Sequence, residues 1–207
     1  MTLASWVRLM VLTDDALLKG RDAVDVCARA VGGGATLIQV RSKTQAPLAV
    51  ASLTRALVAA LAVPVLVNDR VDVALAAGAA GAHLGQDDPP LDRLRPILPP
   101  GFILGISVGS AAEADRVRDW PVDYWSVGPC YTTDTKSDAG AALGVEGFAA
   151  LARRAPPGVP VVAIGGITAA NARPLLTAGA AGVAVIAAVL AASDPERAAR
   201  ELAQALR

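Results

Sequence analysis

Short apolar runs recur along the chain, and each is followed by a polar or glycine-rich segment and then by a stretch with helical spacing. The runs predict eight strands, over residues 8–13, 37–40, 65–67, 81–84, 103–106, 124–127, 161–164 and 183–186. The stretches after them predict helices over residues 22–31, 46–61, 71–77, 89–98, 111–120, 145–154, 171–178 and 195–206. Strict alternation is typical of parallel strands joined by crossover helices, and continuously apolar strands indicate a sheet covered on both faces.

Eight such units predict a closed (β/α)8 barrel, the TIM-barrel fold, as one α/β domain spanning residues 1–207. The length lies near the lower limit of that fold, about 200 residues, and an open doubly wound sheet is the alternative. An internal repeat favours the barrel, because A-G-A-A-G occurs at residues 77–81 and again at 178–182. Two similar half-barrels would place the same turn before the fourth and the eighth strands.

Polar side chains gather where the predicted strands end, whereas the strand starts are mostly Gly, Ala, Pro and Val. The polar residues at or just after strand ends are Thr13, Asp14, Gln39, Arg41, Lys43, Asn68, Asp69, Gln86, Asp87, Asp88 and Ser107. In an α/β barrel, all of these ends lie on one face, where active sites are built. The asymmetry therefore predicts an enzyme.

The connection over residues 128–144 has seventeen residues, whereas most strand-to-helix loops have about two to six. Its threonines, its glycines and Lys136 suit an anion, because hydroxyls, backbone N–H groups and an ammonium can hold phosphate oxygens. A solvated polar loop is the alternative. The Gly165-Gly166 pair after the seventh strand, together with Ile186 and Ala187 at the eighth, matches the phosphate site common in such barrels.

Asp69 and Asp88 follow adjacent strands and are hard oxygen ligands that suit Mg²⁺, with helix N-caps as the alternative for each. Arg41, Lys43 and Lys136 are cations at the same face that suit a diphosphate, although a surface ion pair is the alternative for Arg41 and Lys43. The sequence shows no pairing of a nucleophile with a base. These residues predict a magnesium-bound diphosphate, a separate phosphate, and transfer by ionisation of a diphosphate ester.

The remaining reactive side chains are interpreted as structural. His83 is the single histidine and lies within a strand, so we expect a packed, hydrogen-bonded ring; Cys130 is expected to be packed as well. Two cysteines are too few for a disulfide framework. Lys plus Arg and Asp plus Glu both number 19, which argues against a nucleic-acid partner. With neither a signal peptide nor an apolar run of about 18 residues, we expect a cytoplasmic protein with no membrane span.

Six short motifs carry a resemblance to a known family. They are Q-V-R-S-K at 39–43, N-D-R-V-D-V-A at 68–74, H-L-G-Q-D-D at 83–88, G-I-S at 105–107, G-P-C-Y-T-T-D-T-K at 128–136 and A-I-G-G-I at 163–167. In this order they resemble the thiamine phosphate synthase (thiamine-phosphate pyrophosphorylase) family. The resemblance implies a Mg²⁺-dependent transferase that moves a hydroxymethylpyrimidine group from its diphosphate to thiazole phosphate, through a carbocation, giving thiamine phosphate and diphosphate.

The resemblance also implies roles for single residues. The pyrimidine diphosphate would be bound by Gln39, Arg41, Lys43, Asn68, Ser107 and Lys136. The catalytic set among them would be Arg41, Lys43, Ser107 and Lys136. Mg²⁺ would be bound by Asp69 and Asp88, and thiazole phosphate by Thr133, Thr135, Gly166, Ile186 and Ala187.

The sequence departs from the family pattern at three places. Thr132 stands where a proline is usual, Ala187 stands where a serine is usual, and residues 108–110 replace a histidine-containing run. Two alternatives of the same fold remain open. One is a thiazole tautomerase, against which the retained charged residues argue, and the other is a non-catalytic barrel that binds phosphate or thiamine. The expected partners are small-molecule substrates, and a homo-oligomer is left open.

Overall fold

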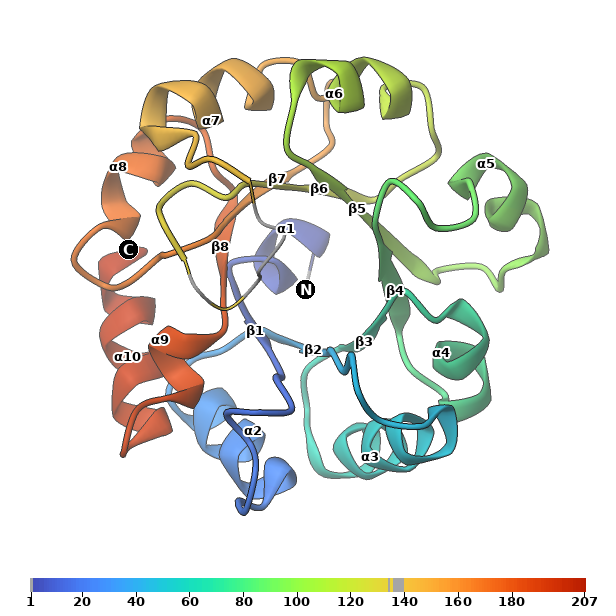
Figure 1. The fold of residues 1–207 in the computed structure, drawn as a ribbon, viewed down its shortest axis with the longest axis vertical. Helices are drawn as coiled ribbons and strands as arrows, with labels where there is room; N and C mark the ends of the chain where they lie inside the picture. The colour runs from blue at the N-terminus through green and yellow to red at the C-terminus, as the bar shows by residue number, and fades with distance from the viewer. Residues whose placement is uncertain (1, 134, 136–139) are drawn as a thin grey trace.

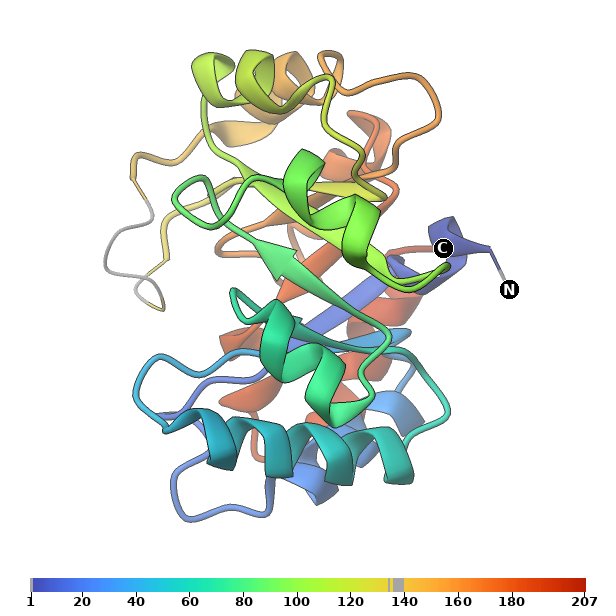
Figure 2. The same ribbon diagram turned by 90° about the vertical axis from the view of Figure 1, so that its right-hand side faces the viewer.

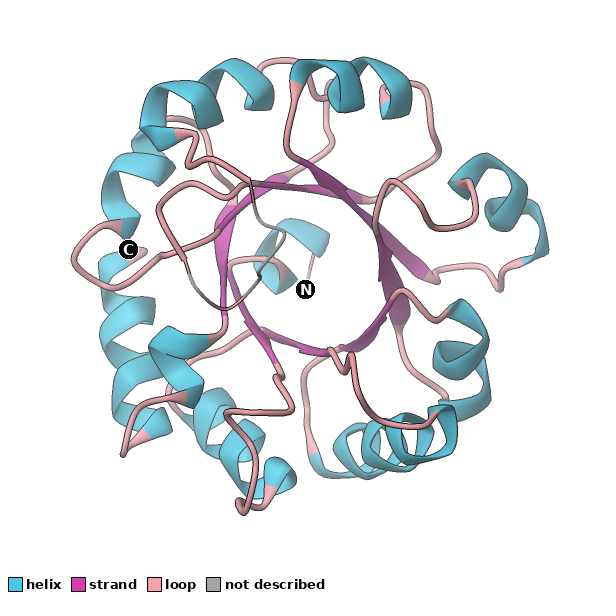
Figure 3. Ribbon diagram, in the orientation of Figure 1, coloured by secondary structure: helices cyan, strands magenta, loops and turns pink. Residues whose placement is uncertain are grey.

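The computed structural model, which describes residues 2–133, 135 and 140–207, contains a closed barrel of strands (Figures 1 and 3). The strands are β1 (Leu9–Leu12), β2 (Leu37–Val40), β3 (Val65–Asn68), β4 (Gly81–Leu84), β5 (Ile103–Val108), β6 (Tyr124–Val127), β7 (Val161–Ile164) and β8 (Gly182–Val185). Each strand pairs in parallel with both neighbours, and β1 closes the barrel on β8. The predicted barrel is confirmed, and the open-sheet alternative is wrong.

Helices form a layer outside the ring of strands, except α1 (Leu3–Trp6), which lies across the opening of the ring in this view (Figures 1 and 3). They are α1 (Leu3–Trp6), α2 (Ala23–Gly32), α3 (Pro47–Ala60), α4 (Val71–Ala77), α5 (Leu91–Leu94) with the 3₁₀ turn η1 (Arg95–Ile97), α6 (Ala111–Val117), α7 (Gly144–Ala152), α8 (Ala172–Thr177), α9 (Ala187–Leu190) and α10 (Pro195–Ala205). All the predicted helices are present, some of them shorter than expected. The apolar pattern does not predict α1 and α9, because helices of four residues are too short to show a period.

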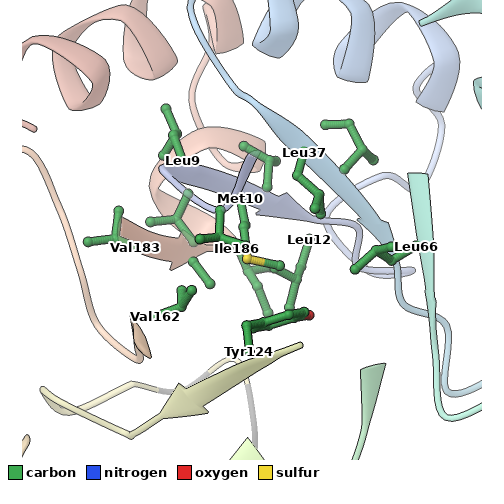
Figure 4. Close-up of a cluster of buried hydrophobic side chains, with 14 of the residues drawn as sticks. Leu9, Met10, Leu12, Leu37, Leu66, Tyr124, Val162, Val183 and Ile186 are labelled. Carbon is green, nitrogen blue, oxygen red and sulfur yellow. The ribbon is translucent and has the colours of Figure 1, made fainter. Parts of the chain in front are cut away.

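The barrel interior has an apolar layer that gives way to polar side chains near the C-terminal ends of the strands. Figure 4 shows apolar side chains and one tyrosine from four strands lying together in this interior, namely Met10, Leu12, Leu37, Leu66 and Tyr124. All five are buried. Nearer the strand ends, the register pairs Asn68 with His83 and Ser107 with Ser126. Polar groups inside a barrel must be hydrogen-bonded or face a cavity, so this layer marks where a site can form.

The two ends of the barrel differ. Figure 2 shows α1 at one end and the loop that follows β6 at the opposite end. Leu3 and Trp6 of α1 pack against the core at their end. The connections that leave the C-terminal ends of the strands gather at the other end, as parallel topology requires. Among the described residues, no helix combines the length and the apolar character needed to cross a bilayer.

The internal repeat forms the same turn twice. Before β4, Ala79 N donates to Ala74 O at 2.9 Å, and before β8, Ala180 N donates to Leu175 O at 3.0 Å. The repeated glycine then begins the strand in both places, as Gly81 and Gly182. Equivalent turns therefore lie four strands apart, which agrees with two similar half-barrels.

Candidate active site

A cavity of about 410 Å³, here called the first cavity, opens at the C-terminal end of the barrel. Its walls come from the ends of β2 to β7 and from the segments that follow them. Six of the residues expected to bind the pyrimidine diphosphate or the metal line it, namely Arg41, Lys43, Asn68, Asp69, Asp88 and Ser107. Charges of both signs thus meet in one cavity, at the face where the sequence places them.

Arg41 is fixed on the cavity wall by groups from the end of β1. Its Nη1 lies 3.1 Å from Asp14 Oδ2, and its side chain is only 9% exposed. Thr13 Oγ1 accepts a hydrogen bond from Arg41 N at 2.8 Å and donates one to Arg41 O at 3.0 Å. The ion pair is therefore buried and not on the surface. The guanidinium has five N–H donors, so part of it remains for an anion.

The loop after β2 is folded around Asp15. Its Oδ2 accepts hydrogen bonds from Ser42 Oγ (2.9 Å), Lys43 N (3.0 Å), Thr44 N (3.1 Å) and Thr44 Oγ1 (2.8 Å). Burial acts to raise the pKa of Asp15, but the hydrogen bonds from Thr44 and Ser42 outweigh it and lower the pKa. The ionised carboxylate holds the loop that carries Lys43, whose Nζ lies 2.7 Å from Asp69 Oδ2.

Asp69 and Asp88 lie close enough to affect each other. Burial raises the pKa of Asp88 and the Asp69 carboxyl raises it further, although a hydrogen bond from Gly85 N at 2.7 Å opposes the rise. Asp69 has a φ of 63°, a conformation that is strained for a residue other than glycine. The N-caps of α4 and α5 are Arg70 and Pro90, so the helix-cap alternative for both aspartates is wrong.

A divalent cation fits the chemistry of this pair. Two neighbouring carboxylates oppose each other's ionisation, and a positive charge beside them relieves that repulsion. In the structure, the ammonium of Lys43 contacts Asp69 and supplies such a charge. The described part of the chain has no group of three or more His, Cys, Asp or Glu side chains that could hold a metal. Bound Mg²⁺ would therefore need other oxygens, and substrate phosphates commonly provide them.

Hydrogen-bonded side chains form part of the inner wall of the first cavity. His83 Nε2 lies 2.9 Å from Ser107 Oγ, and His83 Nδ1 lies 2.8 Å from Tyr124 Oη. The ring is packed and hydrogen-bonded as expected, and it also lines the cavity. Gln39 differs from the expectation, because it is 2% exposed and does not line the cavity. It pairs in register with Leu66, one layer deeper than Asn68.

A second cavity, of about 300 Å³, adjoins the first, and Thr133, Ile164 and Gly165 line both. All the residues expected to bind thiazole phosphate line the second cavity, namely Thr133, Thr135, Gly166, Ile186 and Ala187. The Gly165-Gly166 pair turns with φ values of 100° and 63°, which glycine adopts readily. Helix α9 begins at Ala187, so backbone N–H groups without helical partners lie at this wall.

The loop after β6 is fastened at both of its ends by backbone hydrogen bonds. These run from Cys130 N to Ile164 O (2.8 Å), Tyr131 N to Gly165 O (3.0 Å), Leu143 N to Pro129 O (2.8 Å) and Gly144 N to Cys130 O (2.9 Å). Burial raises the pKa of Cys130 to about 12, so its thiol is packed and unreactive, as expected. Lys136, expected to bind the diphosphate, lies outside the described residues.

Ser126 and Glu113 also line the first cavity and are not among the site residues predicted from the sequence. Ser126 pairs in register with Ser107, and alternation along β6 would have indicated its inward direction. Glu113 Oε2 accepts a hydrogen bond from Gly109 N at 2.6 Å, while Ser110 Oγ accepts one from Glu113 N at 3.2 Å. The S-x-x-E pattern from Ser110 is the signal for this arrangement, because it is typical of a helix start.

Together, these features define a (β/α)8 barrel with two adjoining cavities at its C-terminal face, one of them lined by carboxylates and cations. A family model described as thiamine monophosphate synthase matches residues 9–189. The chain belongs to this family.

Known relatives agree in sequence and in structure. The chain is 46% identical over 201 residues to a protein named thiamine-phosphate synthase from Albidiferax ferrireducens, covering 96% of this chain and 91% of the relative. It is 45% identical over 197 residues to a protein of the same name from Azorhizobium caulinodans, covering 94% and 92%. A solved structure of thiamine phosphate pyrophosphorylase from Pyrococcus furiosus has a TM-score of 0.88 and 35% identity, covering 99% and 98% of the two chains.

Proposed function

We propose that this protein is a thiamine-phosphate synthase. In the reaction, the bond between the pyrimidine methylene carbon and the diphosphate oxygen breaks, and the diphosphate leaves with the electron pair. The thiazole nitrogen donates its lone pair to the carbocation, which gives thiamine phosphate. The observation that carries the proposal is the pair of adjoining cavities with a common wall at Thr133, Ile164 and Gly165, because two anionic substrates must meet to react.

The first cavity suits the pyrimidine diphosphate. Arg41 and Lys43 supply positive charge, while Asn68 and Ser107 supply uncharged hydrogen-bonding groups. Charge on the diphosphate grows as its bond breaks, so groups already oriented toward it stabilise the transition state more than the ground state. We assign the same role to Lys136 from the sequence resemblance. Gln39 is assigned to pyrimidine binding by the sequence resemblance alone, since its buried side chain does not line the cavity.

We propose that Asp69 and Asp88 hold Mg²⁺. The cation, when bound, neutralises charge on the departing diphosphate. Asp69 would exchange its contact with Lys43 for the metal, and this exchange would leave the Lys43 ammonium for a diphosphate oxygen.

The second cavity suits thiazole phosphate. Thr133 and Thr135 bring hydroxyl groups, Gly166 and Ala187 bring backbone N–H groups, and Ile186 brings an apolar side chain. None of the described residues that line this cavity is a lysine or an arginine. Binding there would therefore depend on neutral hydrogen-bond donors, as at other phosphate sites of helix starts and glycine turns.

The decisive experiment supplies the protein with Mg²⁺ and both phosphorylated precursors. We expect thiamine phosphate and diphosphate in equal amounts, and neither product when one precursor is left out. A tautomerase would instead convert a thiazole phosphate isomer without any pyrimidine diphosphate. A non-catalytic barrel would bind the precursors and form no product, and either of these results would overturn the proposal.

A further inference from the structure

A series of hydrogen bonds runs from the barrel interior to the wall of the first cavity. It links Ser107 Oγ on β5 to His83 Nε2 on β4 at 2.9 Å, and His83 Nδ1 to Tyr124 Oη on β6 at 2.8 Å. Gln39 on β2 is buried as well, and its Oε1 accepts no hydrogen bond in the described structure. Tyr124 is fully buried and His83 is 6% exposed, so the bond between them is shielded from bulk water, whereas the bond to Ser107 lies at the cavity wall. Figure 4 shows Tyr124 among the apolar side chains of the interior.

The contact between the rings of His83 and Tyr124 occupies the space that a side chain at Gly105 would fill. The register places Gly105 between His83 on one side and Tyr124 on the other. A Cβ atom at Gly105 would lie 2.2 Å from the Tyr124 ring and 2.5 Å from His83 Nδ1. The two rings meet over this glycine with their centroids 5.4 Å apart. The contact therefore depends on a residue without a side chain on the strand between them.

These hydrogen bonds can run in either of two donor-to-acceptor directions, because a neutral imidazole has one donor nitrogen and one acceptor nitrogen. Burial raises the pKa of Tyr124, so the phenol keeps its proton, and a buried hydroxyl needs an acceptor for that proton. Gln39 Oε1 accepts no hydrogen bond, and His83 Nδ1 lies 2.8 Å from Tyr124 Oη, so the phenol proton is directed to Nδ1. Nε2 of His83 then carries the ring proton and donates it to Ser107 Oγ. The serine proton is left to point into the cavity.

We propose that Tyr124 and His83 are positioning residues that fix the Ser107 hydroxyl as a hydrogen-bond donor toward the first cavity. The substrate atom that meets Ser107 is then an acceptor, either a ring nitrogen or a diphosphate oxygen, and not an amino group. This inference rests on the proposed function, since that function places the pyrimidine diphosphate in this cavity. The opposite polarity would make Ser107 an acceptor there.

The polarity can be read directly, because His83 is the single histidine of the chain and ¹⁵N-labelled histidine gives one imidazole spectrum. We expect a neutral ring in the substrate-free protein, protonated at Nε2 and unprotonated at Nδ1. Tyr124→Phe should shift the Nδ1 resonance, whereas Tyr131→Phe, at the other tyrosine of the chain, should leave the spectrum unchanged. Protonation at Nδ1 in the unmodified protein, or at both nitrogens, would overturn the inference. The spectrum needs no turnover, so it is independent of the proposed function.

A double-mutant cycle tests whether Tyr124 acts through Ser107. Tyr124→Phe should lower kcat/KM for the pyrimidine diphosphate roughly tenfold, the size of one well-placed hydrogen bond, and leave the KM for thiazole phosphate unchanged. In a Ser107→Ala background, the same substitution should cause little further loss. An equal loss in both backgrounds would mean that Tyr124 only supports the fold. If the unmodified protein forms no thiamine phosphate, the proposed function fails, while the polarity is still decided by the spectrum.

Discussion

The charge on Asp88 makes the metal-free protein less stable. Burial and the Asp69 carboxyl raise its pKa, so folding favours the protonated acid, and the stability gained from protonation is lost as pH rises through the folded pKa. We predict that Asp88→Asn raises the melting temperature at neutral pH, without metal, by about 2 °C. The amide oxygen can still accept the hydrogen bond from Gly85 N. Thermal unfolding at several pH values should show this gain shrinking as the solution becomes acidic; a gain that is constant with pH would contradict it.

The same substitution should remove activity. If Asp88 is a magnesium ligand, its loss withdraws charge neutralisation from the leaving diphosphate, and turnover should fall about 100-fold or more. A control is Asp72→Asn, which breaks a pair with Arg70 outside the first cavity and should keep turnover near normal. Steady-state kinetics at saturating Mg²⁺ make the comparison. Near-normal turnover of Asp88→Asn would show that this carboxylate only closes the turn that begins at Gly85.

Ala187 leaves room for one more hydrogen bond in the second cavity. Its side chain is exposed at the cavity wall where α9 begins, so a hydroxyl there could reach a bound phosphate. We predict that Ala187→Ser lowers the KM for thiazole phosphate by roughly two- to tenfold, the effect of one net hydrogen bond. Ala191→Ser, just after α9 and outside the cavity lining, is the matched control. An unchanged KM would mean that backbone donors already satisfy that phosphate oxygen.

At the scale of single residues, the sequence predicts a side chain's place when it follows a strand within a few residues. Asp69 and Asp88 could be placed at the same rim for this reason. The contact between His83 and Tyr124 could not be predicted, because 41 positions separate them and their meeting depends on strand register. The depth of Gln39 was also missed, since the sequence indicates a strand position but not how far the cavity reaches into the barrel.

At the scale of elements, the loop after β2 is held by hydrogen bonds to Asp15, a residue of the loop that follows β1. We predict that Asp15→Ala speeds amide hydrogen exchange at Lys43 and Thr44 and lowers kcat/KM for the pyrimidine diphosphate about tenfold, because Lys43 is no longer held in place. The lowered pKa of Asp15 gives the sign of the pH effect. The stabilisation is present at neutral pH and is lost as pH falls through the folded pKa.

A control for the loop is Asp22→Ala, which removes a carboxylate that accepts a hydrogen bond from Val24 N at 2.9 Å and caps α2. It should reduce stability in a similar way but leave exchange at Lys43 unchanged. Equal exchange in the Asp15 and Asp22 variants would contradict the anchoring role of Asp15.

The periodic elements could be predicted because burial on one face imposes a repeat on the sequence, as in α10 with its buried Ala199 and Leu202. Helix α9 could not be predicted in this way, although its residues Ala187 and Ala188 line the second cavity. Its four residues follow β8 after a single residue, Ile186, and their apolar side chains also suit a strand or a loop. Tertiary context, including the hydrogen bond from Arg21 to Leu190 O at the end of α9, decides its conformation.

At the scale of the whole molecule, strand order predicts which residues share a face but not how the face is divided. Alternation of strands and helices placed the carboxylates, the cations and the glycine turn at one rim. The division into two cavities depends on the first residues after β6, which hydrogen-bond to Ile164 O and Gly165 O at the end of β7. Those bonds put Thr133 on the wall of both cavities, and no sequence pattern reports them.

This division leads to a test of the whole site by ligand stabilisation. A ligand present at about 100 times its Kd stabilises a protein by about 2.7 kcal/mol, which raises the melting temperature by several degrees in a chain of this size. We expect Mg²⁺ with inorganic diphosphate to stabilise the unmodified protein but not Asp88→Asn, because Asp88 lines only the first cavity. Thiazole phosphate should stabilise both proteins.

The reciprocal variant is Ala187→Asp, which puts a negative charge on the wall of the second cavity alone. Repulsion between this carboxylate and the phosphate should abolish the melting shift with thiazole phosphate. The shift with Mg²⁺ and diphosphate should persist, because that ligand would occupy the other cavity. Thermal unfolding of the two variants with each ligand gives four shifts, two of them lost and two retained. If either variant loses both shifts while its unliganded melting temperature stays normal, the two anions share one site, and the separation of pyrimidine diphosphate from thiazole phosphate is wrong.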